Sequence, residues 1–153
     1  MGRVVGLFVG TMPGDPMTSV SEVTAVAGKG LDGDRYAEGR GTFSSTPGTG
    51  RQVTLIESEA VAAAGREYGV AVDPSQTRRN VVTADVPLNH LVGREFTVGD
   101  VRLRGVRLAE PCAHMAALAG DAEVRKALVH RGGLRADILS DGMIRVGDEV
   151  RTG

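Results

Sequence analysis

Apolar residues along the chain come in short runs of strand length, and in several runs they alternate with polar residues. Alternation with a period of two places alternate side chains on opposite faces, so these runs predict half-buried β-strands. The runs predict about eight short strands, which fall in residues 3–9, 21–26, 51–57, 77–83, 94–108 and 134–153. Glycine and proline separate the runs, as is typical of turns.

Two of these runs also carry turn and bulge signals. Gly99 and Asp100 divide one long run, which predicts two strands joined by a hairpin turn. The alternation slips after Gly105, which indicates a β-bulge at that residue. Asp141 and Gly142 predict a second hairpin turn near the C-terminus.

Helical signals are fewer, and they fall in residues 58–69, 86–93, 110–119 and 121–133. The first is the clearest, because Ser58 suits an N-cap, alanines follow it, and Gly69 suits the C-terminal stop. Strands and helices do not alternate regularly, which disfavours a doubly wound sheet. The sequence therefore predicts a mainly β fold, a small and mostly antiparallel barrel-like sheet with three or four short helices.

The composition restricts the class of protein. A chain of 153 residues with 41% apolar residues predicts a single globular domain over residues 1–153. The net charge is −1 and aromatic residues make up 3%, so neither a basic surface nor stacking side chains favour nucleic-acid binding. No apolar run reaches the ~18 residues of a membrane span, and the first residues lack a signal-peptide pattern. We therefore expect a cytoplasmic protein without a membrane partner.

Residues 28–50 are rich in glycine and have no apolar stripe, which predicts a flexible loop over a ligand site. Gly28, Gly30 and Gly33 match the spacing of a dinucleotide-binding motif. That motif requires a helix to begin at the third glycine, and the glycines and proline that follow cannot begin one. A dinucleotide site is therefore disfavoured.

Two polar motifs are candidate ion sites. Asp32 and Asp34 could hold a divalent cation, but the rest of a calcium-loop pattern is missing, so a surface turn is the preferred interpretation. Arg78 and Arg79 lie at a predicted strand start, where arginine can clamp an anion, and Asn80 adds a neutral donor. Because neighbouring strand residues point to opposite faces, we expect one arginine to face a pocket.

Cys112 is the only cysteine, so the chain has no internal disulfide and no multi-cysteine zinc site. A lone cysteine often acts as a small buried hydrophobe. If Pro111 begins a helix, the first turn would instead favour the thiolate, which is the nucleophilic and metal-binding form. His114 would face another side of that helix, which disfavours a protease-like dyad. The residues alone leave both interpretations of the thiol open.

The order of these motifs resembles the MOSC family (molybdenum cofactor sulfurase C-terminal domain). The resemblance runs from about residue 30 to residue 150, through GDR, VTLIESEAV, RRNVVT, LNHLVGREFTVGDVRL, EPC and RGGLRADILSDGMIRVGDEV. It implies a pyruvate-kinase-type β-barrel, in a form that occurs alone in bacteria. Tyr36 departs from the pattern, because many relatives have histidine after GDR.

The resemblance also implies a molybdenum cofactor site. Cys112 would ligate molybdenum or carry persulfide sulfur, and soft sulfur donors suit this metal. Arg78, Arg79 and Asn80 match a segment that contacts the pterin and its phosphate in relatives, and Arg35 would reach the same pocket.

Three functions follow from the resemblance. The first is molybdenum-dependent reduction of N-hydroxylated or similar small molecules, with electrons from an electron-transfer protein and Cys112 as metal ligand. The second is a persulfide carrier supplied by a cysteine desulfurase, and the third is a non-catalytic pterin-binding module. Pyridoxal phosphate is not expected, because its Schiff base needs a placed lysine and the chain has only Lys29 and Lys126.

Overall fold

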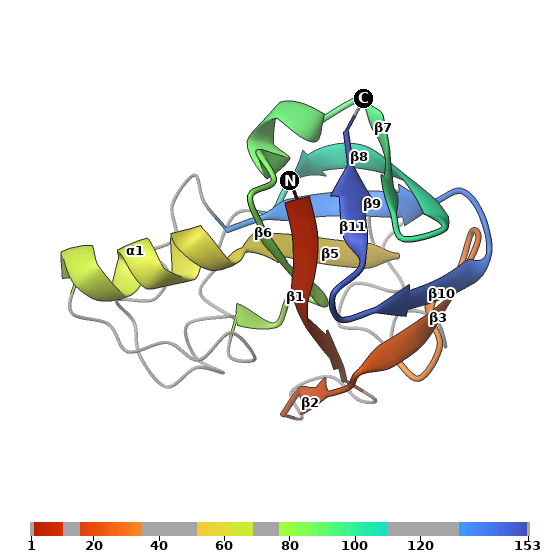
Figure 1. Ribbon diagram of the computed structural model, residues 1–153, viewed down its shortest axis with the longest axis horizontal. Helices are drawn as coiled ribbons and strands as arrows, with labels where there is room; N and C mark the ends of the chain where they lie inside the picture. The colour runs from red at the N-terminus through yellow and green to blue at the C-terminus, as the bar shows by residue number, and fades with distance from the viewer. Residues whose placement is uncertain (1, 11–15, 35–51, 69–76, 110–131, 153) are drawn as a thin grey trace.

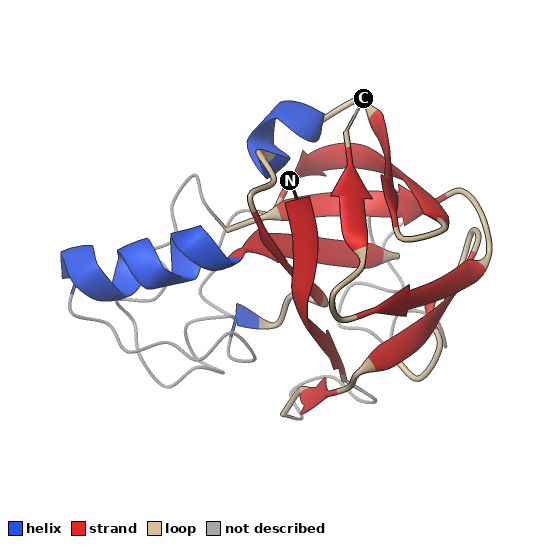
Figure 2. Cartoon of the chain, in the orientation of Figure 1, coloured by secondary structure: helices blue, strands red, loops and turns tan. Residues whose placement is uncertain are grey.

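The computed structural model describes residues 2–10, 16–34, 52–68, 77–109 and 132–152. In these residues strands dominate, and one α-helix, α1 (Ser58–Tyr68), extends away from them (Figures 1 and 2). The strands are β1 (Gly2–Val9), β2 (Thr18–Ser19), β3 (Glu22–Val26), β4 (Gly30–Leu31), β5 (Val53–Glu57), β6 (Val81–Ala84), β7 (Glu95–Val98), β8 (Val101–Leu108), β9 (Leu134–Ile138), β10 (Gly142–Arg145) and β11 (Glu149–Arg151). A 3-10 helix, η2 (Leu88–Leu91), lies between β6 and β7.

Seven strands close into a barrel in the order β11-β7-β8-β9-β5-β6-β1, because β1 pairs with both β6 and β11 (Figure 1). The pairings are antiparallel except that of β5 with β6, which is parallel. β2 pairs with the end of β1, and β10, β3 and β4 form a separate three-stranded sheet. The prediction of a mainly β, mostly antiparallel, barrel-like fold is confirmed.

Side chains alternate between the barrel interior and the outer surface. In β8, Val101 and Leu103 are fully buried, whereas Arg102 and Arg104 are exposed. The largest fully buried side chains include Leu7, Leu31, Leu55, Leu88, Leu103, Leu134, Ile138 and Ile144. Removing this apolar surface from water is the main favourable contribution to folding, and it fixes the register of each strand.

The β-bulge predicted at Gly105 is confirmed. The register of β8 against β9 shifts between Gly105 and Arg107. A side chain at Gly105 would overlap the carbonyl group of Leu91, because η2 packs against the bulge there. Glycine is thus required at this position for a close approach of two backbone segments.

The prediction of three or four helices is not matched in the described residues. α1 confirms the helix predicted for 58–69 to within one residue at its end, and η2 is the predicted one-turn helix. The two remaining helices were predicted for residues 110–119 and 121–133. Of these, only residues 132 and 133 are described.

The hairpin predicted at Asp141 and Gly142 is wrong. β9 pairs with β8 and β5, whereas β10 pairs with β3, so the two strands that flank this turn do not pair with each other. The Asp141 carboxylate accepts a hydrogen bond from the Ala27 N–H at 2.7 Å, which directs the chain to the three-stranded sheet. The turn signal was local, but the pairing depended on a strand more than a hundred residues earlier.

The loop predicted for residues 28–50 contains a short strand near its beginning. Gly30 and Leu31 form β4, and a turn follows over residues 32–34. Residues 35–50 lie outside the described part of the chain. Among the described helices, none has both the length and the apolar character needed to cross a membrane.

Candidate functional site

Polar side chains are buried at the point where the chain enters β6. Thr77, Arg79 and Asn80 come directly before this strand, and their side chains are hidden from solvent. Arginine and asparagine are rarely buried unless their polar atoms are hydrogen-bonded inside the protein. The hydrogen bonds of this segment therefore show which parts of the chain it holds together.

Asn80 joins the beginnings of β5 and β6 through Thr54. The Asn80 N–H donates to the Thr54 carbonyl at 3.0 Å, which continues the parallel pairing of the two strands. In return, the N–H and the hydroxyl of Thr54 both donate to Asn80 Oδ1 at 3.1 Å. These two donors fix the orientation of the amide, so that its Nδ2 group is available to segments outside β5.

The Nδ2 group of Asn80 bonds to two such segments. It donates to the Phe8 carbonyl in β1 at 3.1 Å and to Asp34 Oδ1 at 3.3 Å. The same oxygen of Asp34 accepts the N–H of Gly10 at 3.0 Å. Asp34 is fully buried, so this carboxylate connects the end of β1 with the residues before β6.

Sequence reasoning missed the role of Asp34. The preferred interpretation of Asp32 and Asp34 was a surface turn, which holds for the exposed Asp32 and is wrong for Asp34. Gly33 adopts a positive φ of 87° between them, and this turn directs Asp34 inward. No local signal marked the burial, because the partners Gly10 and Asn80 are distant in sequence.

Arg79 bonds in a different direction from Asn80. Its Nε donates to the Gly132 carbonyl at 2.7 Å, and its Nη2 donates to the Ala109 carbonyl at 2.7 Å. The side chain is only 6% exposed. Ala109 and Gly132 are the described residues on either side of residues 110–131, the segment that contains Cys112.

Arg78 differs from its neighbours. It is only partly buried, and its φ of 62° lies in the left-handed region that non-glycine residues rarely adopt. Both arginines precede β6, so strand alternation does not decide which of them faces a pocket. A non-glycine residue in this region costs about 1–2 kcal/mol, and such positions occur often at functional sites.

Three residues of the sequence hypotheses lie outside the described part of the chain. They are Arg35, Cys112 and His114. Arg35 directly follows Asp34, and Cys112 is the third residue after Ala109. The structure therefore brings Asn80 together with Asp34, and Arg79 together with the residues that flank the cysteine segment.

Two carboxylates with shifted pKa values lie at the opposite end of β5 from Thr54. Partial burial raises the pKa of Glu57, and the charge of Glu59 adds to this, while the Leu88 N–H and His90 oppose it. Burial also acts to raise the pKa of Glu59, but hydrogen bonds to its carboxylate outweigh burial and leave the pKa lowered. The Asp85 N–H is the largest of these, at 2.8 Å. These groups support the start of α1 and are not part of the candidate site.

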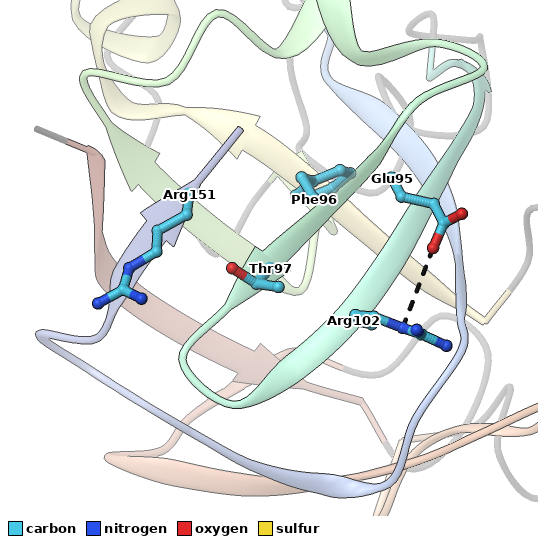
Figure 3. Close-up of a pocket in the computed structure, with 5 residues that line it drawn as sticks. All are labelled: Glu95, Phe96, Thr97, Arg102 and Arg151. Carbon is cyan, nitrogen blue, oxygen red and sulfur yellow. Dashed lines mark ion pairs between the residues drawn. The ribbon is translucent and has the colours of Figure 1, made fainter. Parts of the chain in front are cut away.

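A surface pocket of about 300 Å³ lies on another part of the barrel, over β7, β8 and β11 (Figure 3). Its lining consists of Glu95, Phe96, Thr97, Arg102 and Arg151. Glu95 and Arg102 form an exposed ion pair at 3.9 Å (Figure 3), which contributes little to stability. This pocket contains none of the predicted site residues.

The described part of the chain also holds no cluster of three or more His, Cys, Asp or Glu side chains suited to a metal.

Comparisons with known proteins agree with the barrel. YuaD from Bacillus subtilis superposes with a TM-score of 0.77 at 16% identity, over 98% of this chain and 94% of its own. YiiM from Geobacillus stearothermophilus gives 0.74 at 15% identity, over 100% of this chain and 75% of its own. YiiM from Escherichia coli superposes with a TM-score of 0.71 at 16% identity, over 100% of this chain and 70% of its own. At these identities the likeness shows the fold.

The sequence itself adds the family. No curated protein matches the chain. The sequence profile of the MOSC domain, however, matches residues 40–151, which include β5 to β11 and the site residues Arg78, Arg79 and Asn80. This match covers well over half of the chain, and the barrel agrees with it. The chain belongs to the MOSC domain family.

Proposed function

We propose that this protein binds molybdenum cofactor and uses Cys112 as the thiolate ligand of the metal. The site would lie at the end of the barrel where Asp34, Arg79 and Asn80 are buried. Membership of the MOSC domain family supports this proposal, because the family is associated with that cofactor. The geometry around Arg79 supports it independently.

The supporting observation is the pair of hydrogen bonds from Arg79 to Ala109 and Gly132. They hold Ala109 and Gly132, the described residues on either side of residues 110–131, to one side chain. Chain connectivity alone keeps the Cα atom of Cys112 within about 11 Å of that of Ala109, since three residues span no more. The only thiol of the chain would therefore lie at the same end of the barrel as Asn80 and Arg78.

The residues present fit the cofactor in kind. The cofactor carries a phosphate, which arginine binds bidentately, and a soft metal, which prefers sulfur. The partly buried Arg78, held at a φ of 62°, has the backbone strain that often accompanies a functional side chain. Arg78 would hold the phosphate together with Arg35, and Cys112 would hold the metal. When bound, the cofactor would supply two-electron redox chemistry.

The reaction that fits this chemistry is the reduction of an N-hydroxylated small molecule. The N–O bond breaks, the substrate takes up two electrons and two protons, and the oxygen leaves as water. A separate electron-transfer protein would supply the electrons. The roles of this chain would be to orient the cofactor through Arg78 and to hold the ends of the cysteine segment through Arg79.

Metal analysis tests the proposal. The protein is purified from a host that makes molybdenum cofactor, and molybdenum and pterin are measured per chain for wild type, Cys112→Ala and Arg78→Met. We expect near-stoichiometric molybdenum and pterin in wild type. Cys112→Ala should lose about 10- to 100-fold in bound metal, by analogy with lost metal-site partners. Absence of molybdenum from wild type, or equal amounts in wild type and Cys112→Ala, would contradict the proposal.

Two other results would assign a different function. A gain of one sulfur atom on Cys112 after incubation with a cysteine desulfurase and cysteine, without molybdenum in wild type, would identify a persulfide carrier. Bound pterin without reduction of any N-hydroxylated compound would identify a binding module. Alkylation of Cys112 only after unfolding would identify a buried thiol with no chemical role.

A further inference from the structure

We infer that Arg79 is a positioning residue, which sets the spacing of the two ends of the cysteine segment and does not itself bind the cofactor phosphate. The inference deepens the proposed function and rests on it for one of its two measurements. It starts from the direction of the guanidinium group. Its Nε and Nη2 atoms point to the carbonyl groups of Gly132 and Ala109, both at 2.7 Å.

The two carbonyls belong to residues that the sheet already brings together. The Ala109 N–H donates to the Gly133 carbonyl at 2.8 Å, which extends the antiparallel pairing of β8 and β9 beyond Leu108 and Leu134. The pairing of β8 and β9 leaves the carbonyls of Ala109 and Gly132 within reach of a single side chain. Arg79 reaches them from the other side of β5, because β6 and β9 flank that strand.

The close packing of Gly133 against β5 restricts where the chain next to Gly132 can lie. Its φ of 111° and its close approach to β5 exclude a side chain, because a Cβ atom there would overlap the Leu55 carbonyl oxygen. The returning end of the segment is thus pressed against β5, next to the Thr54 backbone that Asn80 holds. Arg79 and Asn80 are adjacent in sequence. Arg79 holds Ala109 and Gly132, which flank the cysteine segment, and Asn80 holds Phe8 near the end of β1.

Arginine suits this role better than lysine. Its planar group presents several donors at fixed relative positions, so one side chain can hold two carbonyls at a set separation. A lysine ammonium keeps the charge but offers no such rigid fork. A phosphate contact and a positioning contact therefore respond differently to Arg79→Lys. A phosphate contact is partly preserved, whereas the spacing of the two carbonyls is lost.

The test uses Arg79→Lys, Arg79→Gln and, as a matched control, Arg104→Gln, which changes an exposed arginine of β8. Alkylation of Cys112 by iodoacetamide is measured in cofactor-free protein at one pH, at a temperature where circular dichroism shows every variant folded. Because Cys112 is the only cysteine, the rate reports on one position. Molybdenum retention is measured on protein from a cofactor-making host.

We expect both Arg79 variants to change the alkylation rate several-fold and to retain about 10- to 100-fold less molybdenum, as lost outer-shell partners do. Arg104→Gln should behave as wild type in both measurements. Unchanged alkylation in the folded Arg79→Lys protein, or molybdenum retention by Arg79→Lys close to that of wild type, would overturn the inference. If wild type holds no molybdenum the proposed function fails, while the alkylation rates still decide the role of Arg79. Arg79→Lys decides alone if Arg79→Gln does not fold.

Discussion

The side-chain amide of Asn80 donates a hydrogen bond to the buried carboxylate of Asp34 at 3.3 Å, across 46 positions of sequence. The same Asp34 oxygen accepts the Gly10 N–H, and the amide oxygen of Asn80 accepts two donors of Thr54. One connected network thus joins the end of β1, the turn after β4 and the beginnings of β5 and β6. Connected, satisfied networks of this kind specify one arrangement of the segments that they join.

The first prediction concerns the carboxylate of Asp34. Asp34→Ala should lower the free energy of unfolding by about 2 kcal/mol, because the buried donors of Gly10 and Asn80 lose their acceptor. Asp32→Ala is the matched control, since Asp32 is exposed in the same turn, and it should cost about 0.5 kcal/mol or less. Urea unfolding measures both. Equal effects of the two substitutions would show that the hydrogen bonds accepted by Asp34 do not stabilise the fold.

The second prediction concerns the amide of Asn80. Asn80→Asp places a second carboxylate beside Asp34 and removes the Nδ2 donor, so unfolding should become easier by about 2–4 kcal/mol at pH 7. Repulsion from the neighbouring carboxylate favours the protonated form of the introduced carboxyl group and raises its pKa in the folded protein. The loss should therefore shrink as the pH falls below this raised pKa. Asn89→Asp, at an exposed position, is the control. A loss that does not depend on pH would count against the contact with Asp34.

The third prediction concerns the crowding at Gly133. Gly133→Ala combines an unfavourable φ of 111° with overlap on the Leu55 carbonyl. Gly147→Ala is a matched control, because its φ is 97° and nothing lies within 4 Å of the added Cβ atom. We expect about 1–2 kcal/mol of destabilisation for Gly147→Ala and about 1–3 kcal/mol more for Gly133→Ala. Thermal unfolding compares them, and similar melting temperatures would contradict the close approach of β9 to β5.

The fourth prediction separates Glu57 from Glu59 by pH. Burial raises the pKa of Glu57 in the folded protein, so ionisation destabilises the fold as the pH rises through that pKa. The free energy of unfolding of Glu57→Gln minus that of wild type should then be larger at pH 7 than at pH 4. The pKa of Glu59 is lowered, so its contribution is present above the unfolded-state pKa and is lost in acid.

Glu59→Gln should accordingly destabilise the protein at pH 7 and have less effect as the pH falls through the lowered pKa of Glu59. Chemical unfolding of the two variants at pH 4 and pH 7 gives the comparison. The two stability differences should change in opposite directions between these pH values. A change in the same direction for both variants would show that the hydrogen bond from Asp85 does not control Glu59.

Local patterns predicted the features of the barrel that depend on the residues of a single strand. The alternation in β8 and its bulge at Gly105 both follow from the order of residues within that strand. The turn at Asp141 was also recognised, but turn chemistry does not say whether the strands on either side pair. Here β10 pairs with β3 instead of β9, and this depends on distant strands.

The candidate site was less predictable for the same reason. RRN was predicted to bind an anion, but the hydrogen bonds of Arg79 and Asn80 include partners 53 and 46 residues away. Asp34 lies in a glycine-rich run that has the composition of a surface loop, yet it is buried and bonded to Gly10 and Asn80, which are distant in sequence. The types of residue in the site could be predicted from the sequence. Which of them form contacts depends on how the barrel closes.

The coordination of molybdenum by Cys112 is tested most directly by X-ray absorption at the molybdenum edge. Wild type and Cys112→Ser are prepared from the same cofactor-making host, and the number of sulfur neighbours of the metal is compared. The proposed function predicts one sulfur neighbour fewer in Cys112→Ser than in wild type. The same number of sulfur neighbours in both proteins would contradict it.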